Sequence, residues 1–216
     1  MKVLVFGATG GSGRAVVETL LSAGHEVTAF VRGAGRMQAA PGLAIVEGDA
    51  LNADDVARAV PGHDAVVISL GTRPGARDWF PGRRGAAPPR VCEIGTRNVI
   101  AALPDGARPR IVVVSAYGVG DTRDSAAWYI RLYLRLFMRD LMADKDRQEA
   151  ALKDTALDFV LVQPVALTDG PARGYYMADP AGHIRKQQVS RRDLADFVLR
   201  ELSHPRHHRA TVALSG

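Results

Sequence analysis

The chain begins with a short apolar segment that leads directly into a glycine-rich loop. Residues 1–6 are long enough for one buried strand, and residues 7–13 read Gly-Ala-Thr-Gly-Gly-Ser-Gly. An amphipathic stretch, Arg14 to Ala23, follows. Glycine permits a sharp turn and a close approach of main-chain N–H groups to a pyrophosphate, and a helix starting there directs its unpaired N–H groups at the same anion. The order of strand, loop and helix predicts a dinucleotide-binding unit.

The next apolar segment supplies the second half of such a site. Glu26 to Val31 is rich in β-formers and ends at Arg32, and Arg36 lies four residues further on. A site for NAD has Asp or Glu at this point, where the carboxylate binds the ribose 2′-hydroxyl. Arginine here suits a 2′-phosphate, because a guanidinium binds phosphate through two parallel hydrogen bonds. The pattern predicts NADP(H); the alternative is that both arginines are solvated loop charges.

The length and the cysteine content favour one cytoplasmic domain. We expect the 216 residues, 47% of them hydrophobic, to form a single NAD(P)-binding domain over 1–216 with a small C-terminal elaboration on the substrate side. No segment resembles a membrane span, and the chain starts on a strand, so no signal peptide is expected. The single Cys92 permits no internal disulfide and is expected to be a packing residue.

The charge distribution argues against nucleic acid as a partner. The net charge is +5, but the arginines are spread along the chain and no dense basic run occurs. A phosphorylated cofactor and an anionic or aromatic small-molecule substrate would use this charge equally well. His204, His207 and His208 are expected to be solvated rather than to bind a metal, because Pro205 interrupts them.

Apolar segments and amphipathic segments alternate along the chain. Strands are expected at Val3–Phe6, Glu26–Val31, Ala44–Glu47, Ala65–Ser69, Ile111–Ser115, Phe159–Gln163 and Thr211–Leu214. Helices are expected at Ser12–Ala23, Ala53–Val60, Val91–Leu103, Ser125–Asp154 (open to a break) and Arg192–Ser203. The alternation predicts an α/β fold of the Rossmann type, a doubly wound parallel sheet with helices on both faces. Ligands of such a sheet bind at the carboxyl ends of its strands.

Two segments exceed what a minimal sheet needs. Thr72 to Arg90 is rich in Pro, Gly and Arg, and we leave open whether it is a lid over the substrate or disordered. Trp128 to Met142 is apolar except for Arg131, Arg135 and Arg139, which recur every four residues. A helix this apolar must be covered by another surface. We favour a homodimer contact over a hydrophobic substrate pocket.

With these residues in hand, the chain resembles atypical short-chain dehydrogenases/reductases, in particular the NAD(P)H-binding group that includes biliverdin IXβ reductase/flavin reductase. The resemblance covers nearly the whole chain. The motifs that carry it are Gly7-Ala8-Thr9-Gly10-x-x-Gly13, Val31-Arg32 with Arg36, Gly48-Asp49, Leu70-Gly71-Thr72-Arg73, Gly95 to Val99, Ser115-Ala116-Tyr117, and Leu157-Asp158-Phe159 leading to Pro164.

The resemblance implies a role for each of these positions. Gly10, Ser12 and Gly13 would contact the pyrophosphate, and Arg32 and Arg36 the 2′-phosphate. The full set of expected cofactor-binding residues is Gly7, Thr9, Gly10, Gly11, Ser12, Gly13, Arg32, Arg36, Asp49, Ala50, Leu70, Gly71, Thr72, Arg73, Ser115, Pro164 and Val165. The candidate catalytic residues are Ser115, which would face the nicotinamide and substrate, and Tyr117, a weaker candidate for a proton donor.

The sequence lacks the Tyr-x-x-x-Lys pair through which most short-chain dehydrogenases donate a proton. No lysine stands four residues after any tyrosine. Lys145 is expected to form a surface pair with Glu149, the alternative being a catalytic lysine. Our leading hypothesis is an NADPH-dependent reductase that transfers hydride to a flavin, tetrapyrrole, quinone or similar conjugated acceptor. The alternatives are a non-catalytic NADP(H)-binding regulator and, less favoured for want of a large C-terminal substrate domain, a sugar or isoprenoid epimerase.

Overall fold

A computed structural model describes residues 1–71, 90–104 and 106–216 of the chain. Within these residues eight strands form one sheet in the order β3-β2-β1-β4-β5-β6-β10-β8. The strands are β1 (Lys2–Phe6), β2 (Glu26–Val31), β3 (Leu43–Glu47), β4 (Ala65–Ile68), β5 (Arg110–Val114), β6 (Phe159–Pro164), β8 (Met177–Asp179) and β10 (Ala210–Ser215). All pair in parallel except β8, which pairs antiparallel with β10. The predicted doubly wound parallel sheet is confirmed.

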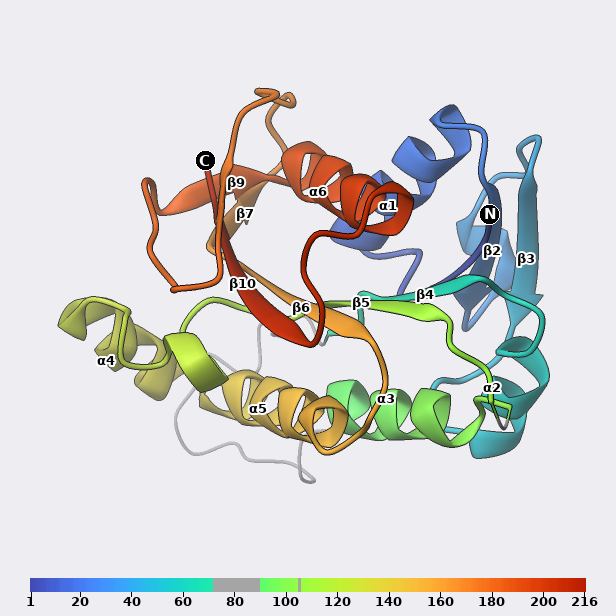
Figure 1. Ribbon diagram of the computed structural model, residues 1–216, viewed down its shortest axis with the longest axis horizontal. Coiled ribbons are helices and arrows are strands. Elements are labelled where there is room, and N and C mark those ends of the chain that lie inside the picture. The colour runs from blue at the N-terminus through green and yellow to red at the C-terminus, as the bar shows by residue number, and fades with distance from the viewer. Residues whose placement is uncertain (72–89, 105) are drawn as a thin grey trace.

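Helices cover both faces of this sheet (Figure 1). One face carries α1 (Gly11–Ser22) and α6 (Arg191–Ser203), which pack against each other, and the other carries α2 (Ala53–Ala59), α3 (Val91–Ala101) and α5 (Arg139–Lys153). The central strands are buried along their whole length, which explains why β4 reads as an unbroken apolar run. Two apolar cores result, one on each side of the sheet.

The long predicted helix over Ser125–Asp154 is divided in two. Helix α4 (Trp128–Phe137) ends at Met138, whose backbone (φ −125°, ψ 17°) leaves the helical range, and α5 starts directly after it. Arg139 therefore belongs to α5 and does not continue the stripe of Arg131 and Arg135 along a single helix.

Short elements between β6 and α6 were not anticipated from the sequence. They are β7 (Ala166–Thr168) and β9 (Gln188–Ser190), which pair in parallel, and the edge strand β8. Two 3-10 turns, η1 (Ala34–Arg36) and η3 (Gly120–Thr122), complete the elements that the structure describes. Among the described residues no helix is both long and apolar enough to cross a membrane.

Candidate functional site

The glycine loop between β1 and α1 is shaped by close backbone contacts. Gly7 has a φ of +76°, and a Cβ there would lie 2.2 Å from the carbonyl oxygen of Ser69 at the end of β4. A Cβ on Gly13 would lie 2.2 Å from the Gly7 carbonyl oxygen. These two glycines are needed for packing between loop, helix and strand. At Gly10, by contrast, an added Cβ would meet only the Gly7 oxygen, at 3.3 Å.

The first turn of α1 is left without a side-chain cap. Gly10 is the N-cap residue and makes no side-chain hydrogen bond, so the positive end of the helix dipole is not neutralised there. The side chain of Arg191, at the start of α6, lies over this turn: a Cβ on Gly11 would be 2.7 Å from its Nε atom. Arg191 also pairs with Asp169 at 2.6 Å. The arrangement brings a guanidinium and a helix N-terminus to one place and suits a pyrophosphate.

Arg32 stands at the carboxyl end of β2, where the sequence analysis expected a 2′-phosphate. Its side chain is exposed, and no hydrogen bond or ion pair joins it to any residue the structure describes. The neighbouring loop is fixed by the Gly48 N–H, which donates to the Val31 carbonyl at 2.9 Å. Within that loop Asp49 accepts from the Leu51 N–H and forms no ion pair with Arg32. Arg36 is the last residue of η1.

The segments expected beside the adenine and along the cofactor meet α3. Asn98 donates to the Ala50 carbonyl at 2.8 Å, and a Cβ on Gly95 would lie 2.5 Å from Leu70 Cδ1. The small residue on α3 thus lets the ends of β3 and β4 approach the helix. Gly71 follows Leu70 directly. The remaining expected residues of this segment, Thr72 and Arg73, lie outside the described residues, as does most of the Thr72–Arg90 loop.

Lys145 is buried beneath the site, so the expected surface pair with Glu149 is wrong. Its ammonium donates to the carbonyl oxygens of Leu70 at 2.8 Å and Val114 at 2.6 Å, and to Gln148 Oε1 at 3.3 Å. It therefore ties the carboxyl ends of β4 and β5 together. The ammonium is buried because α5 turns this face toward the sheet, where backbone carbonyls replace its water.

Ser115, at the end of β5, is held by a buried carboxyl group. Its hydroxyl donates a short hydrogen bond to Glu149 Oε1, which also accepts from Gln163 Nε2 at 2.7 Å. Burial raises the pKa of Glu149, and these hydrogen bonds oppose the rise. Glu149 Oε2 has no hydrogen-bond partner among the described residues, and its nearest cation is Lys153, whose Nζ lies 3.8 Å away. The orientation of the Ser115 hydroxyl depends on this carboxyl group.

Tyr117 is poorly placed to donate a proton. Its ring is buried, its hydroxyl donates to the Gly182 carbonyl at 3.2 Å, and burial raises the pKa of the phenol above its usual value. Its N–H donates to the Pro164 carbonyl at 3.0 Å, so the chain after β5 lies beside the end of β6. Val165 follows Pro164 and is buried. Tyr117 thus contributes to the wall of the site.

Cys92 is a packing residue, as expected, whereas His207, expected to be solvated, is partly buried against Glu201. Cys92 is buried, and burial raises the pKa of its thiol to about 11. His207 accepts or donates a hydrogen bond at Glu201, and His208 at Asp158. Within the described parts of the chain no group of His, Cys, Asp and Glu could hold a metal ion.

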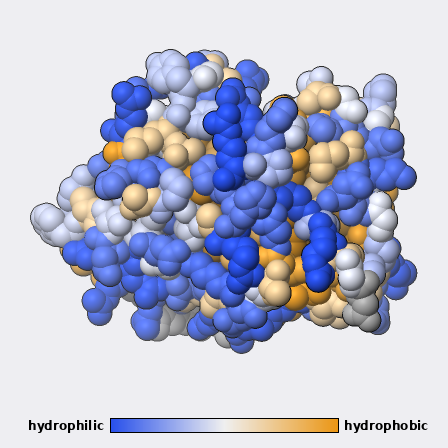
Figure 2. Space-filling model, in the orientation of Figure 1, coloured by the Kyte–Doolittle hydropathy of each residue, from blue (hydrophilic) through white to orange (hydrophobic). Residues whose placement is uncertain are grey.

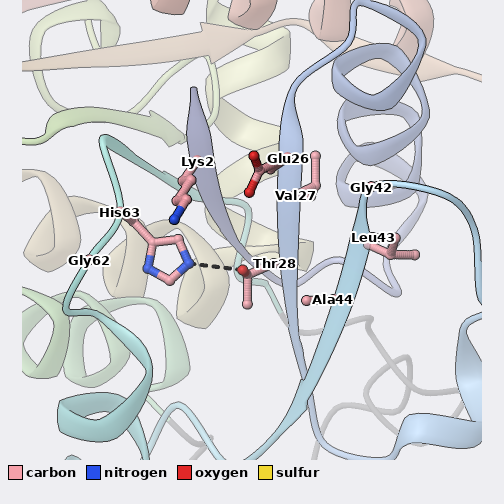
Figure 3. A pocket seen from close by; sticks show the side chains of 9 residues that line it. All are labelled: Lys2, Glu26, Val27, Thr28, Gly42, Leu43, Ala44, Gly62 and His63. Carbon is pink, nitrogen blue, oxygen red and sulfur yellow. Dashed lines mark hydrogen bonds between the residues drawn. The ribbon is translucent and has the colours of Figure 1, made fainter.

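A pocket at the opposite edge of the sheet is separate from this site. Figure 3 shows it between the amino ends of β1, β2 and β3, with His63 hydrogen-bonded to Thr28 at 2.9 Å. Lys2 and Glu26 also line it. Because dinucleotides bind at the carboxyl ends of parallel strands, this pocket is on the wrong side of the sheet for the cofactor.

Comparison with known proteins assigns the family. Residues 7–205 match the model of a family described as NAD(P)H-binding. The chain belongs to this NAD(P)H-binding family. It is 30% identical over 220 residues to YwnB of Bacillus subtilis (strain 168), a protein without a characterised function, and the match covers 96% of this chain and 94% of YwnB.

Two solved structures show the same fold. ChuY, described as an anaerobillin reductase from Escherichia coli O157:H7, matches with a TM-score of 0.75 at 23% identity, over 100% of this chain and 97% of ChuY. A short-chain dehydrogenase/reductase from Veillonella parvula DSM 2008, solved in complex with NADP, matches with a TM-score of 0.80 at 16% identity, over 100% of this chain and 94% of that one.

Three residues of the site were missed from the sequence. The sequence analysis does not single out Arg191, and it expects Lys145 and Glu149 to form a surface pair. A signal for Lys145 exists: Leu141, Lys145, Gln148 and Leu152 recur at helical spacing, which places the lysine on the apolar stripe of α5. A charged residue within such a stripe has to find polar partners in the interior.

Proposed function

We propose that this member of the NAD(P)H-binding family is an NADPH-dependent reductase of a small conjugated acceptor. Two observations carry the proposal: the uncapped, glycine-lined start of α1, and the position of Arg32, without a partner among the described residues, at the end of β2, the strand paired with β1. The cradle suits a pyrophosphate, and the lone guanidinium suits a 2′-phosphate. The solved relative in complex with NADP supports the same choice of cofactor.

Different residues of this chain would then bind different parts of the cofactor. Gly10, Gly11 and Ser12 present main-chain N–H groups to the pyrophosphate, and Arg191 adds a positive charge over the same turn. Arg32 and Arg36 select the 2′-phosphate. Thr9, Asp49, Ala50, Leu70 and Gly71 would lie along the dinucleotide, and Pro164 and Val165 beside its nicotinamide ring. Thr72 and Arg73, which fall outside the described residues, are proposed for the same stretch of the cofactor.

The acceptor needs placement more than it needs a strong acid. A bound reduced nicotinamide supplies the hydride. The residue four positions before Lys145 is Leu141, so the usual tyrosine acid is missing, and Tyr117 is tied to a backbone carbonyl. Ser115 orients the acceptor or the carboxamide, with its hydroxyl set by Glu149. A conjugated acceptor spreads the incoming charge, so water can supply the proton.

The test is pre-steady-state oxidation of bound NADPH with a panel of flavin, quinone and tetrapyrrole acceptors. We expect at least one class to oxidise NADPH in a step whose rate depends on acceptor concentration. Oxidation that is lost in Tyr117→Phe would contradict the proposed chemistry, because it would make the tyrosine the acid.

A second candidate, a non-catalytic NADP(H)-binding regulator, is favoured by one observation. The hydroxyls of Ser115 and Tyr117 are both engaged by other groups of the chain, so neither is free to act as an acid in this conformation. Tight NADPH binding with no oxidation by any acceptor class would select this candidate.

A further inference from the structure

Helix α4 and the loop after β5 enclose a groove that the proposed cofactor site does not use. The groove has a volume of about 600 Å³, within the range of sites that hold a drug-sized molecule. Figure 1 shows α4 at the left, on the side toward which β5 leads. Gly118 and Leu134 form part of the groove wall, and they meet so closely that a Cβ on Gly118 would lie 2.8 Å from Leu134 Cδ1.

The groove carries more positive charge than its own carboxylates neutralise. Arg123 pairs with Asp146 at 2.6 Å, and Arg131 pairs weakly with Asp124 at 3.4 Å. The other two guanidiniums that line it, those of Arg135 and Arg139, have no hydrogen-bond or ion-pair partner within the described ranges of the chain. Figure 2 shows hydrophilic side chains with paler ones among them over α4, at the left of the view.

The same groove offers an apolar wall. Trp128, a residue that is 71% exposed, lines it together with Leu132, Leu134 and Met142. An indole and a guanidinium both stack on flat conjugated rings. An apolar wall next to two unpaired arginines matches a ligand that has a flat apolar body and an anionic group.

The groove begins next to the site of hydride transfer. Gly118 is three residues after Ser115, and Met142 is three residues before Lys145 on α5, a rise of about 4.5 Å along the helix. A ligand in the groove can therefore extend its conjugated body to the ends of β5 and β6. A second copy of the chain is a poorer occupant, because it would bring two sets of unpaired arginines together.

We propose that this groove binds an amphipathic organic anion, with the carboxylate or phosphate on Arg135 and Arg139 and the conjugated body against Trp128. That this ligand is the hydride acceptor rests on the proposed function; that the groove binds such an anion does not. The arginines thereby determine acceptor specificity, since a neutral molecule of the same shape leaves both guanidiniums unpaired.

FMN and riboflavin test this directly, because they share one ring system and differ by a phosphate. Each is titrated against the protein by flavin fluorescence, with NADP⁺ present at saturation to occupy the glycine loop. The wild-type protein is expected to bind FMN at least about tenfold more tightly than riboflavin. Arg135→Gln/Arg139→Gln is expected to remove that preference, whereas Arg108→Gln, an exposed arginine before the amino end of β5, is expected to keep it.

Two further readouts locate the effect. Trp128→Leu is expected to weaken both flavins by a similar factor, because it removes the stacking surface and leaves the charges in place. Calorimetric titration of NADP⁺ itself is expected to give the same affinity in the wild type and in the arginine double variant. Failure of NADP⁺ to bind would remove the proposed function and leave the flavin comparison to be made without cofactor. Equal affinities for FMN and riboflavin, or a preference for FMN that survives in the double variant, would overturn the proposal.

Discussion

The glycine loop after β1 and helix α4 both lie near the carboxyl ends of the strands, and they are held in opposite ways. In the loop, Gly7 and Gly13 touch backbone atoms so closely that one methyl group cannot be added. Helix α4, described along its whole length, has no buried side chain, and Trp128, Leu136 and Phe137 are each more than 60% exposed. The glycine loop is therefore built by backbone packing, which tolerates no change. Helix α4 instead presents exposed side chains, which can be varied without unfolding the sheet.

The largest expected effect is at Gly7. Gly7→Ala places a Cβ against the Ser69 carbonyl oxygen and also forces a left-handed backbone, so it should cost more than about 4 kcal/mol or prevent folding. Gly174→Ala is the matched control, because Gly174 has a similar φ of +72° but open space around it, and it should cost about 1–2 kcal/mol. Urea unfolding measures both. Equal losses would show that the loop is not held by close contacts.

A smaller effect is expected where the two regions meet, at the end of β5. Ser115→Ala should lower the rate of hydride transfer by about tenfold, equivalent to about 1.4 kcal/mol, since the oriented hydroxyl is lost. Tyr117→Phe should keep most of the activity with a flavin or quinone, at the expense of one hydrogen bond to Gly182. Single-turnover oxidation of NADPH compares the two variants. A greater loss in Tyr117→Phe than in Ser115→Ala would reverse their assigned roles.

On α4, Phe137→Glu should change contacts with other molecules and leave the fold intact. Phe137 is 63% exposed, so the free energy of unfolding should change by no more than about 0.5 kcal/mol. Self-association or acceptor binding should be reduced, measured by light scattering and by flavin titration. Tyr175→Glu, at an exposed aromatic residue outside α4, is the control. The contrary result is a wild type that is a monomer and a Phe137→Glu variant with the same assembly state, acceptor affinity and activity. That result would show that the exposed face of α4 has no partner.

The smallest expected effect is a change in how stability depends on pH. Burial raises the pKa of Glu149 above its ordinary value of about 4.5. At a pH between the ordinary and the raised value, the folded state therefore holds a proton that the unfolded state has lost. Stability from this group therefore falls as the pH rises from about 4.5 through the raised pKa. Glu149→Gln removes the titration. The urea midpoint of this variant should therefore increase relative to the midpoint of the wild type as the pH rises. A gap that is constant with pH would mean that Glu149 is ionised in the folded state as readily as in the unfolded state.

The sequence predicted the strongly periodic parts of the fold. The apolar runs of β1, β2 and β4, the glycine loop and the alternation of strands and helices determine the sheet, because each element has to bury one or both faces. Strands β7, β8 and β9 were missed because each has only three residues, too few to show a period of two. A break in the helix over Ser125–Asp154 was allowed for, but its position at Met138 was not predicted, since neither Pro nor Gly marks it.

The candidate site could be proposed from the sequence only where a motif fixes the backbone. Gly7 to Gly13 and Arg32 follow directly from the strand–loop–helix order. Lys145, Glu149 and Arg191 reach the site through tertiary packing: α5 turns its charged residues inward, and α6 brings Arg191 over α1. Lys145 and Glu149 are four residues apart on a helix, and this spacing fits both a solvated ion pair and two buried groups with separate partners. The sequence alone therefore did not distinguish the two arrangements.

The most direct test of the account is the affinity for NADPH and NADH in the wild type and in Arg32→Ala. Arg32 is the one arginine at the end of β2 whose side chain is described. No other described residue forms a hydrogen bond or an ion pair with its guanidinium. Loss of a guanidinium–phosphate contact costs about 1.5–3 kcal/mol. The account predicts that the wild type prefers NADPH and that Arg32→Ala weakens NADPH by at least about tenfold while changing NADH little. Equal losses for both dinucleotides, or a wild-type preference for NADH, would contradict it.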